Sequence, residues 1–208
     1  MVFSDSVFIC VFLPIVLAGY YICPKRLRNS FLLLVSLVFY AWGEPKYVFL
    51  MMFSIAINYA FGLLLDRSRK NVRLSKALLA LSVVIDIGLL CVFKYTDFVI
   101  TNLNRAFNAD IGLVNLALPI GISFYTFQAM SYTIDVYRDD VKVQRNILDF
   151  GMYITMFPQL IAGPIVRYSD VEAQLKERSV SAEDFASGIC RFVVGLGKKV
   201  LLANQIGA

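Results

Sequence analysis

The sequence predicts an all-α protein, a polytopic transmembrane helical bundle in which one helix is broken or re-entrant. Hydrophobic residues make up 59% of the 208 residues and charged residues only 17%, against about 25% charged residues in soluble domains. The apolar residues stand in long blocks rather than in alternation, which favours helices over a transmembrane barrel. Basic residues gather in short loops, as topology signals do, and no basic–aromatic patch indicates a nucleic-acid partner.

The first three predicted spans cover residues 7–23, 30–43 and 47–65. The first span lacks the basic start and the small-residue cleavage site of a signal peptide, so we expect it to be retained. A basic loop follows it and predicts a cytoplasmic side there, which places the N-terminus outside. Tyr40 and Trp42, at the end of the second span, suit the membrane interface.

The fourth predicted span covers residues 77–100, and it follows a segment, 66–76, with five basic residues and one acid. We expect that segment to be cytoplasmic and the polar connector 101–117 to lie on the outer side. Asp86 and Lys94 share a face of the span but stand two turns apart. They either form part of a polar relay, or Asp86 pairs with a neighbouring helix while Lys94 reaches the interface.

Asn58 stands alone as a strongly polar residue inside the third span. We expect it to form a hydrogen bond to a neighbouring helix. The chain would otherwise carry an amide group into lipid, where an unsatisfied polar group is costly.

The fifth predicted span, residues 119–137, carries the polar face around which the chain is organised. Pro119 suits the first turn of this span, because the first N–H groups of a helix have no helical acceptor and proline has no N–H to leave unpaired. On a helical projection Gln128, Tyr132 and Asp135 share one face, with Ser131 beside them. An acid facing lipid costs at least ~2.5 kcal/mol, so this face should meet protein or a water-filled cavity. It is either the wall of a buried polar pathway or a polar seam that holds helices together.

The last third of the chain is less regular. Pro158 and Pro164 interrupt the predicted span 147–165, which we expect to be broken or re-entrant. A polar segment follows as a surface helix and a loop, and Ser181 is positioned to cap the last predicted span, 185–206. We therefore interpret residues 1–208 as the truncated, N-terminal part of a single transmembrane domain.

The cysteines and the missing histidines restrict the chemistry. Four cysteines, Cys10, Cys23, Cys91 and Cys190, stand far apart in or beside apolar runs, and we expect them to be small buried side chains without a disulfide. The sequence contains no histidine, which removes the commonest general base and the commonest metal ligand. No metal site is expected.

Four stretches carry a resemblance to a known family. They are MVFSDSVFICVFLPIVLAGYY at the start, YAWGEPKYVFLM at 40–51, LPIGISFYTFQAMSYTIDVYR at 118–138 and FPQLIAGPIVRYSD at 157–170. Together they resemble the membrane-bound O-acyltransferase superfamily, in its bacterial alginate O-acetyltransferase branch. The D-alanyl transfer protein of teichoic acid synthesis is a near cousin.

The resemblance implies an acyl transfer across the bacterial inner membrane by a multi-pass protein. An acyl group, here acetyl, would pass from a cytoplasmic donor such as acetyl-CoA or an acyl carrier to an extracytoplasmic polysaccharide such as alginate. Partner acetyltransferase subunits would complete the transfer, and no bound cofactor is implied. The essential histidine of the family lies in a later segment, so these 208 residues are expected to hold no catalytic residue and to be inactive alone.

The resemblance also gives the polar residues candidate roles. Acyl transfer to a hydroxyl needs a base and a site that stabilises an oxyanion. The residues that would line such a chamber are Gln128, Ser131, Tyr132 and Asp135. Arg138 and Arg167 would attract an anionic donor at its cytoplasmic mouth, or they are ordinary anchors on the inner side.

Two other functional classes stay open from the sequence. A transporter or channel would use Asp86, Asp135 and the broken segment as a substrate path. A non-catalytic membrane scaffold would dock partner subunits without performing chemistry.

Overall fold

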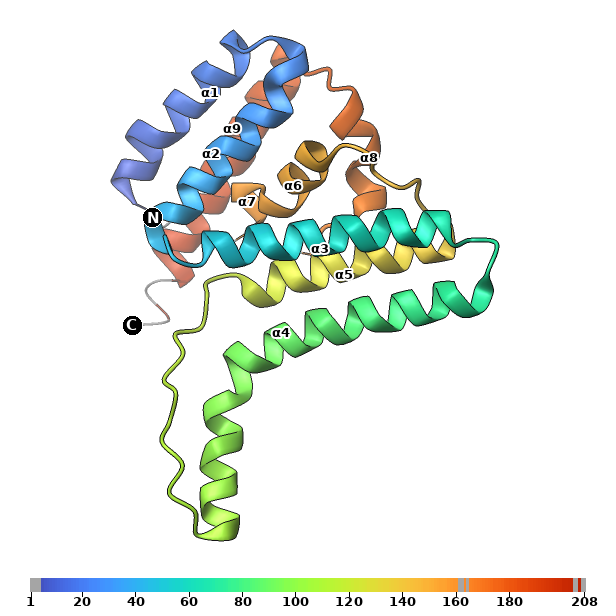
Figure 1. The fold of residues 1–208 in the computed structure, drawn as a ribbon. Helices are drawn as coiled ribbons and strands as arrows, with labels where there is room; N and C mark the ends of the chain where they lie inside the picture. Colours follow the sequence, from blue (N-terminus) through green and yellow to red (C-terminus); the bar gives the residue numbers. More distant parts are fainter. Residues whose placement is uncertain (1–4, 161–162, 164, 204–205, 207–208) are drawn as a thin grey trace.

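The computed structural model describes residues 5–160, 163, 165–203 and 206, and every element in them is helical (Figure 1). This confirms the predicted all-α class. The elements are η1 (Phe8–Phe12), α1 (Leu13–Ile22), η2 (Lys25–Leu27), α2 (Arg28–Gly43), α3 (Val48–Arg67), α4 (Val72–Phe107), α5 (Ile122–Arg138), α6 (Ile147–Thr155), α7 (Phe157–Leu160), α8 (Tyr168–Lys176), α9 (Ala182–Lys198) and η3 (Lys199–Ala203). Two of them, α3 and α4, are long and apolar enough to cross a membrane by length and composition.

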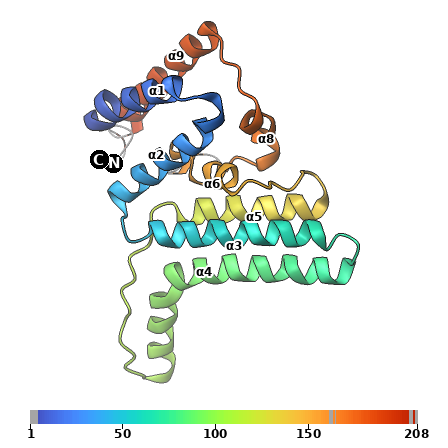
Figure 2. The ribbon, with the colours of Figure 1, turned by 45° about the horizontal axis from the view of Figure 1, so that its top comes forward.

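Three helices form a central layer. α5 packs against both α3 and α4, and Figures 1 and 2 show the three running side by side. α6 packs on α2 and on α3, so it joins this layer to the N-terminal helices. Large aromatic side chains fill the junction, and the fully buried ones include Tyr125, Tyr132, Phe150, Tyr153 and Tyr168.

The charged loops gather on one side of the bundle. Arg69, after α3, pairs with Asp139, after α5. Asn29, at the start of α2, donates a hydrogen bond of 2.7 Å to Asp149 in the first turn of α6. The connections before α2, between α3 and α4, and between α5 and α6 are therefore neighbours at one end of the bundle, and the compartment that they face stays a prediction.

The opposite connections also meet. Tyr47, in the turn before α3, donates a hydrogen bond of 2.8 Å from its hydroxyl to the carbonyl of Ala117. The α2–α3 turn and the segment before α5 therefore lie together at the other end, as alternating loops require.

α4 is longer than predicted. It continues to Phe107, so the first part of the connector 101–117 is helical. Polar side chains that suggested a loop instead bond to their own helix: Thr101 donates to the carbonyl of Asp97, and Asn102 to that of Phe98. At ~1.5 Å per residue the 36 residues have a length of about 54 Å along the helix axis, longer than a hydrocarbon core of about 30 Å. The helix is not straight, because Figure 1 shows a bend about halfway along.

The start of α5 also differs from the prediction. Pro119 is not in the first turn, because the helix begins at Ile122 after Gly121, whose φ is +78°. A Cβ at Gly121 would lie 2.7 Å from the carbonyl oxygen of Leu160. This close approach and the left-handed backbone both require glycine there.

Several side chains expected inside or at the interface are placed differently. Cys10, Cys91 and Cys190 are exposed and Cys23 is half-buried, so the prediction of buried cysteines is wrong, although all four thiols are free. Small apolar side chains are equally suited to a helix face that meets lipid. Trp42 is exposed as an interface residue should be, whereas Tyr40 is buried in the core.

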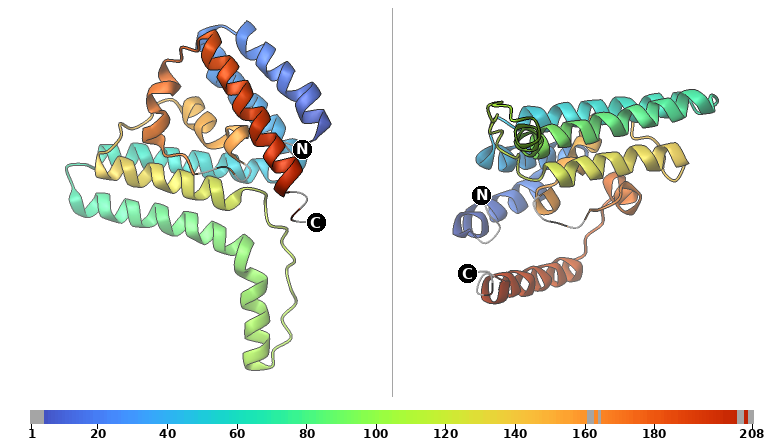
Figure 3. Two further views of the ribbon diagram at one scale, coloured as in Figure 1. Left: turned by 180° about the vertical axis from the view of Figure 1, so that it is seen from behind. Right: turned by 90° about the horizontal axis from the view of Figure 1, so that it is seen from below.

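α9 stands apart from the other helices. It has no buried residue, and its capping box joins Ser181 to Asp184, which confirms the predicted cap. Its contact with α1 runs through Tyr21 and Phe185, whose rings meet edge to face at 5.9 Å. The right-hand view of Figure 3 shows α9 set off from the other helices, although it overlaps α2 in the left-hand view.

Candidate functional site

The broken segment creates an unusual backbone position. α6 ends at Thr155, and α7 begins at Phe157, just before Pro158, so the predicted break is found. Residues 161, 162 and 164 of the predicted span 147–165 lie outside the described residues, and whether this segment re-enters stays a prediction. The N–H of Phe157 turns away and donates to Ser36 of α2 at 3.2 Å. This leaves the carbonyl of Tyr153 without the helical donor it would otherwise have.

Two glutamine side chains converge on that carbonyl. Gln128 of α5 and Gln159 of α7 each donate from Nε2 to the oxygen of Tyr153, both at 2.9 Å. Gln128 is buried, with 4% of its surface exposed. Two amide donors aimed at one point are the arrangement that stabilises an oxygen with negative charge, and here the Tyr153 carbonyl occupies that point.

Tyr132 lies one turn further along the same face of α5. Its hydroxyl accepts a hydrogen bond of 2.9 Å from the backbone N–H of Gln144. Its ring contacts Phe150 at 4.7 Å and Tyr168 at 5.0 Å between centroids. The side chain is therefore held between α5, α6 and α8, and it fixes the loop that enters α6.

Asp135 is almost fully buried near the end of α5, and its Oδ2 has no hydrogen-bond partner among the described residues. The charges of Arg167 and Arg138 act on it, opposed by those of Asp140 and Asp170. Both arginines are exposed. An unpaired buried carboxylate oxygen under the influence of two exposed arginines is a polar site that a proton, water or ligand donor would satisfy.

Ser131 does not join this group as a free hydroxyl. It is half-buried, and its Oγ donates to the carbonyl of Gln128 at 2.8 Å. Gln128, Tyr132 and Asp135 thus share the predicted protein-facing side of α5, while the Ser131 hydroxyl bonds its own helix and also acts on Tyr153 of α6.

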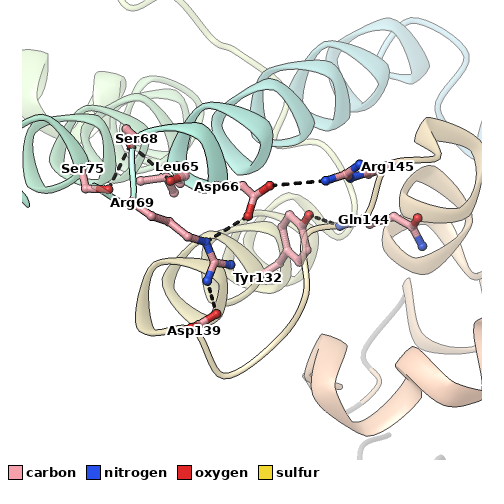
Figure 4. Close-up of polar contacts among 9 residues, drawn as sticks. All are labelled: Leu65, Asp66, Ser68, Arg69, Ser75, Tyr132, Asp139, Gln144 and Arg145. Atoms are coloured by element: carbon pink, nitrogen blue, oxygen red, sulfur yellow. Dashed lines mark hydrogen bonds and ion pairs between the residues drawn. The ribbon is translucent and has the colours of Figure 1, made fainter. Parts of the chain in front are cut away.

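An ion-pair cluster lies next to Tyr132 at this end of the bundle (Figure 4). Arg69 pairs with Asp66 at 2.9 Å and with Asp139, and Arg145 approaches Asp66 at 4.0 Å. The hydrogen bond to Asp139 raises the pKa of Arg69 above its ordinary value. The cluster joins the 66–71 and 139–145 loops, a connection that the sequence did not reveal.

A groove lies next to the glutamine pair. It has a volume of about 1020 Å³ between α1, α2, α7, α8 and α9, and its walls include Tyr153 and Gln159. We call it the α1–α9 groove; its apolar wall includes Leu13, Val16, Leu32, Phe157, Phe192 and Leu196. Gln128, Ser131, Tyr132 and Asp135 are not among the residues that line it, and Gln128 reaches its wall through the bond to the Tyr153 carbonyl.

The sequence pointed to Gln128 and Tyr132 but not to Gln159, which shares the Tyr153 carbonyl with Gln128, or to Gln144, which bonds Tyr132. Gln159 and Gln144 become important only because the break in α6 and the loop before it bring them to Tyr153 and Tyr132. The tandem of Pro158 and Gln159 was the available clue, since a break frees carbonyls and a neighbouring amide can satisfy them. Among the described residues, no three His, Cys, Asp or Glu side chains group as metal ligands would.

Comparison with known proteins gives relatives over the whole chain. It is 40% identical over 212 residues to the probable alginate O-acetylase AlgI of Pseudomonas aeruginosa, covering 100% of this chain and 41% of that protein. It is 40% identical over 210 residues to the protein of the same name from Azotobacter vinelandii, covering 99% and 42%. A peptidoglycan O-acetyltransferase of Helicobacter pylori is 32% identical over 237 residues, covering 99% and 45%.

This similarity along the whole chain confirms the resemblance to the membrane-bound O-acyltransferase superfamily. It spans about two-fifths of the length of these relatives, with 41% and 42% covered in the first two. No family model matches the chain, and no solved structure matches it.

Proposed function

We propose that the chain is part of a membrane-bound O-acyltransferase that moves an acetyl group from a cytoplasmic donor to hydroxyl groups of an extracytoplasmic polysaccharide. The observation that carries the proposal is 40% identity along the entire chain to a probable alginate O-acetylase. Alginate is therefore the proposed acceptor, and the bacterial inner membrane the proposed location. Acetyl-CoA or an acyl carrier is the proposed donor, and partner acetyltransferase subunits are proposed to complete the transfer.

The arrangement of the loops supports the proposed direction. The connections with the strongest basic character, 24–28 and 66–76, lie on the same side as the 139–146 loop. Basic loops stay in the cytoplasm. The Asp135 end of α5 would then face the donor, because Arg138 and the 139–146 loop follow it directly.

The reaction requires a base, an oxyanion site and a positioned donor. The chain has no histidine, so it supplies no imidazole base. We propose instead that it supplies the polar wall: Gln128 orients the Tyr153 carbonyl, Tyr132 holds the loop into α6, and Asp135 contributes a buried acceptor. Arg138 and Arg167 are proposed to attract the anionic donor.

A segment exchange tests this function. In Pseudomonas aeruginosa, the 212 residues of its acetylase that match this chain are replaced by the chain, and the acetyl ester content of secreted alginate is measured. The matching segment from Azotobacter vinelandii serves as the control for the splice junctions. We expect the exchange to restore acetylation, and the 208 residues expressed alone to give none.

Substitutions in the exchanged segment test the roles. Gln128→Ala and Asp135→Ala should lower acetylation at unchanged protein level, and Arg138→Gln with Arg167→Gln should weaken it at limiting donor. A stable, membrane-inserted exchange protein that leaves alginate unacetylated would refute the function. Normal acetylation in both Gln128→Ala and Asp135→Ala would refute the proposed wall alone.

A further inference from the structure

We propose that the α1–α9 groove and the charged pocket beside it together bind one anionic phospholipid of the cytoplasmic leaflet. The headgroup phosphate would sit in the charged pocket and an acyl chain in the groove. This site is separate from the acetyl transfer proposed above.

The groove has the character of a lipid site. It runs between two helices predicted to span the membrane, and its walls are mainly aliphatic and aromatic. Its volume of about 1020 Å³ lies at the upper end of ligand pockets, which run from about 300 to 1,000 Å³. Phe192 and Leu196 of α9 line it, although α9 buries none of its residues against protein.

A second pocket adjoins the groove and supplies charge. Its volume is about 1310 Å³, and it shares five wall residues with the groove: Tyr20, Leu175, Glu177, Arg178 and Ser179. Its remaining walls come from the 25–29 segment, the start of α6 and α8. The groove and the pocket are therefore continuous, and one molecule could place an apolar part in the groove and a polar part in the pocket.

The pocket carries a surplus of free positive charge. Its cations are Lys25, Arg26, Arg28, Lys176 and Arg178, and its carboxylates are Asp149, Glu172 and Glu177. Glu172 is paired with Lys176 at 2.9 Å, and Asp149 already accepts hydrogen bonds from Asn29 and Asn146.

Two of the cations are held in place. The guanidinium of Arg28 stacks over the ring of Tyr20 at 4.8 Å, at the wall that the two pockets share. Arg178 donates from Nε to the carbonyl of Gln174 at 2.7 Å and also bonds Asn29. A guanidinium fixed by such contacts keeps further N–H groups for a phosphate.

The chemistry and the predicted side of the membrane point to the same occupant. The 24–28 loop is expected in the cytoplasm, where anionic lipids enrich the inner leaflet, and basic pockets between transmembrane helices on that side bind such headgroups. A soluble anion would use the pocket but leave the apolar groove unfilled.

The test uses the chain purified in detergent and mixed with phosphatidylglycerol or with phosphatidylcholine. Bound lipid per protein is measured by native mass spectrometry. Arg26→Gln with Arg28→Gln should lower phosphatidylglycerol binding, about fivefold for each arginine, the factor that corresponds to ~1 kcal/mol per basic residue. Arg67→Gln with Arg73→Gln is the matched control, since these residues lie at the end of α3 and the start of α4, outside the pocket, and it should leave binding unchanged.

A second pair of variants tests the apolar part without touching a charge. Gly195 lines the groove and a Cβ there meets nothing within 4 Å, so Gly195→Trp should fill the groove without disturbing the fold. Gly188 has the same open surroundings on the same helix but does not line the groove. Only Gly195→Trp should reduce phosphatidylglycerol binding.

Four results would overturn the proposal. Equal retention of both lipids would remove the role of charge, and an equal loss in the Arg67 and Arg73 variants would indicate general attraction. Competition by glycerol phosphate alone, with Gly195→Trp unaffected, would assign the pocket to a soluble anion. Binding of neither lipid would mean that another protein segment covers the groove.

Discussion

Asn58 and Asp86 join α3 to α4 through a hydrogen bond of 2.8 Å from the amide nitrogen to Oδ1 of the carboxyl group. Both side chains are almost fully buried, and the other two oxygens, Oδ1 of Asn58 and Oδ2 of Asp86, have no partner among the described residues. A proton on Asp86 would turn its unpartnered Oδ2 into an O–H donor. This pairing confirms that Asn58 bonds a neighbouring helix, and that Asp86 pairs there.

The first prediction is that Asp86→Asn preserves stability whereas Asp86→Leu does not. An amide at position 86 supplies an N–H where the protonated acid supplies O–H, so the free energy of unfolding should change by less than about 1 kcal/mol. Leucine would remove the bond between α3 and α4, leave the buried Asn58 amide nitrogen with only the Ser54 carbonyl at 3.1 Å, and cost ~1–3 kcal/mol. Thermal unfolding in detergent measures both, with Asp110→Asn as the exposed control. Equal losses in the two Asp86 variants would contradict a protonated acid.

The second prediction concerns the Tyr153 carbonyl. Gln128→Ala and Gln159→Ala each leave one amide donor in place, so each should cost about 0.5–1.5 kcal/mol of unfolding free energy. The double variant leaves a bare carbonyl at the break and should cost more than the sum, with a coupling of about 0.5–3 kcal/mol. A double-mutant cycle by thermal unfolding measures this coupling. Strict additivity would show that the two amides do not share the carbonyl.

The third prediction contrasts two glycines. Gly121→Ala should destabilise the protein by about 1–3 kcal/mol, because φ is +78° and the new Cβ would lie 2.7 Å from the Leu160 oxygen. Gly88→Ala, within α4 and with nothing within 4 Å of its Cβ, should instead stabilise by about 0.5–1 kcal/mol. The measurement is the thermal unfolding midpoint of each variant, which should fall for Gly121→Ala and rise for Gly88→Ala. A harmless Gly121→Ala would place α5 away from α7.

The sequence predicted where helices form because apolar runs and their breaks are local features. Pro158 predicted the break after α6, and Ser181 predicted the cap of α9. The length of α4 was not predictable in the same way, because Thr101 and Asn102 satisfy their side chains on the helix itself. Residue type alone does not tell whether such a side chain ends a helix or bonds back to it.

The sequence predicted part of the candidate site, because helical periodicity is also a local feature of the chain. The periodicity of α5 placed Gln128, Tyr132 and Asp135 on its protein-facing side, since burial follows the helical repeat. It did not identify their partners, because Gln144 and Gln159 reach the site only after the chain between α5 and α7 has folded. Tertiary partners of a buried polar group are not encoded in its own helix.

The last prediction is the membrane side of each connection, tested with single cysteines at positions 105, 142 and 177. The native Cys10, Cys23, Cys91 and Cys190 are first replaced by alanine, since three of them are exposed and would react. An impermeant thiol reagent should label Arg105→Cys in intact spheroplasts, and Lys142→Cys and Glu177→Cys only after lysis.

Contacts between the connections explain the side expected for each position. Lys142 lies in the loop whose Asp139 pairs with Arg69, and Glu177 follows Leu175, whose carbonyl accepts a hydrogen bond from Asn29. Both positions are therefore tied to basic connections, whereas Arg105 lies in the last turn of α4, away from them. Arg73→Cys, in the most basic loop, is the matched inside control. One result would contradict this prediction: labelling of Lys142→Cys from outside while Arg73→Cys stays protected. The two positions would then lie on opposite sides of the membrane although the Arg69–Asp139 ion pair holds their connections together. That result would also refute the proposed direction of acetyl transfer.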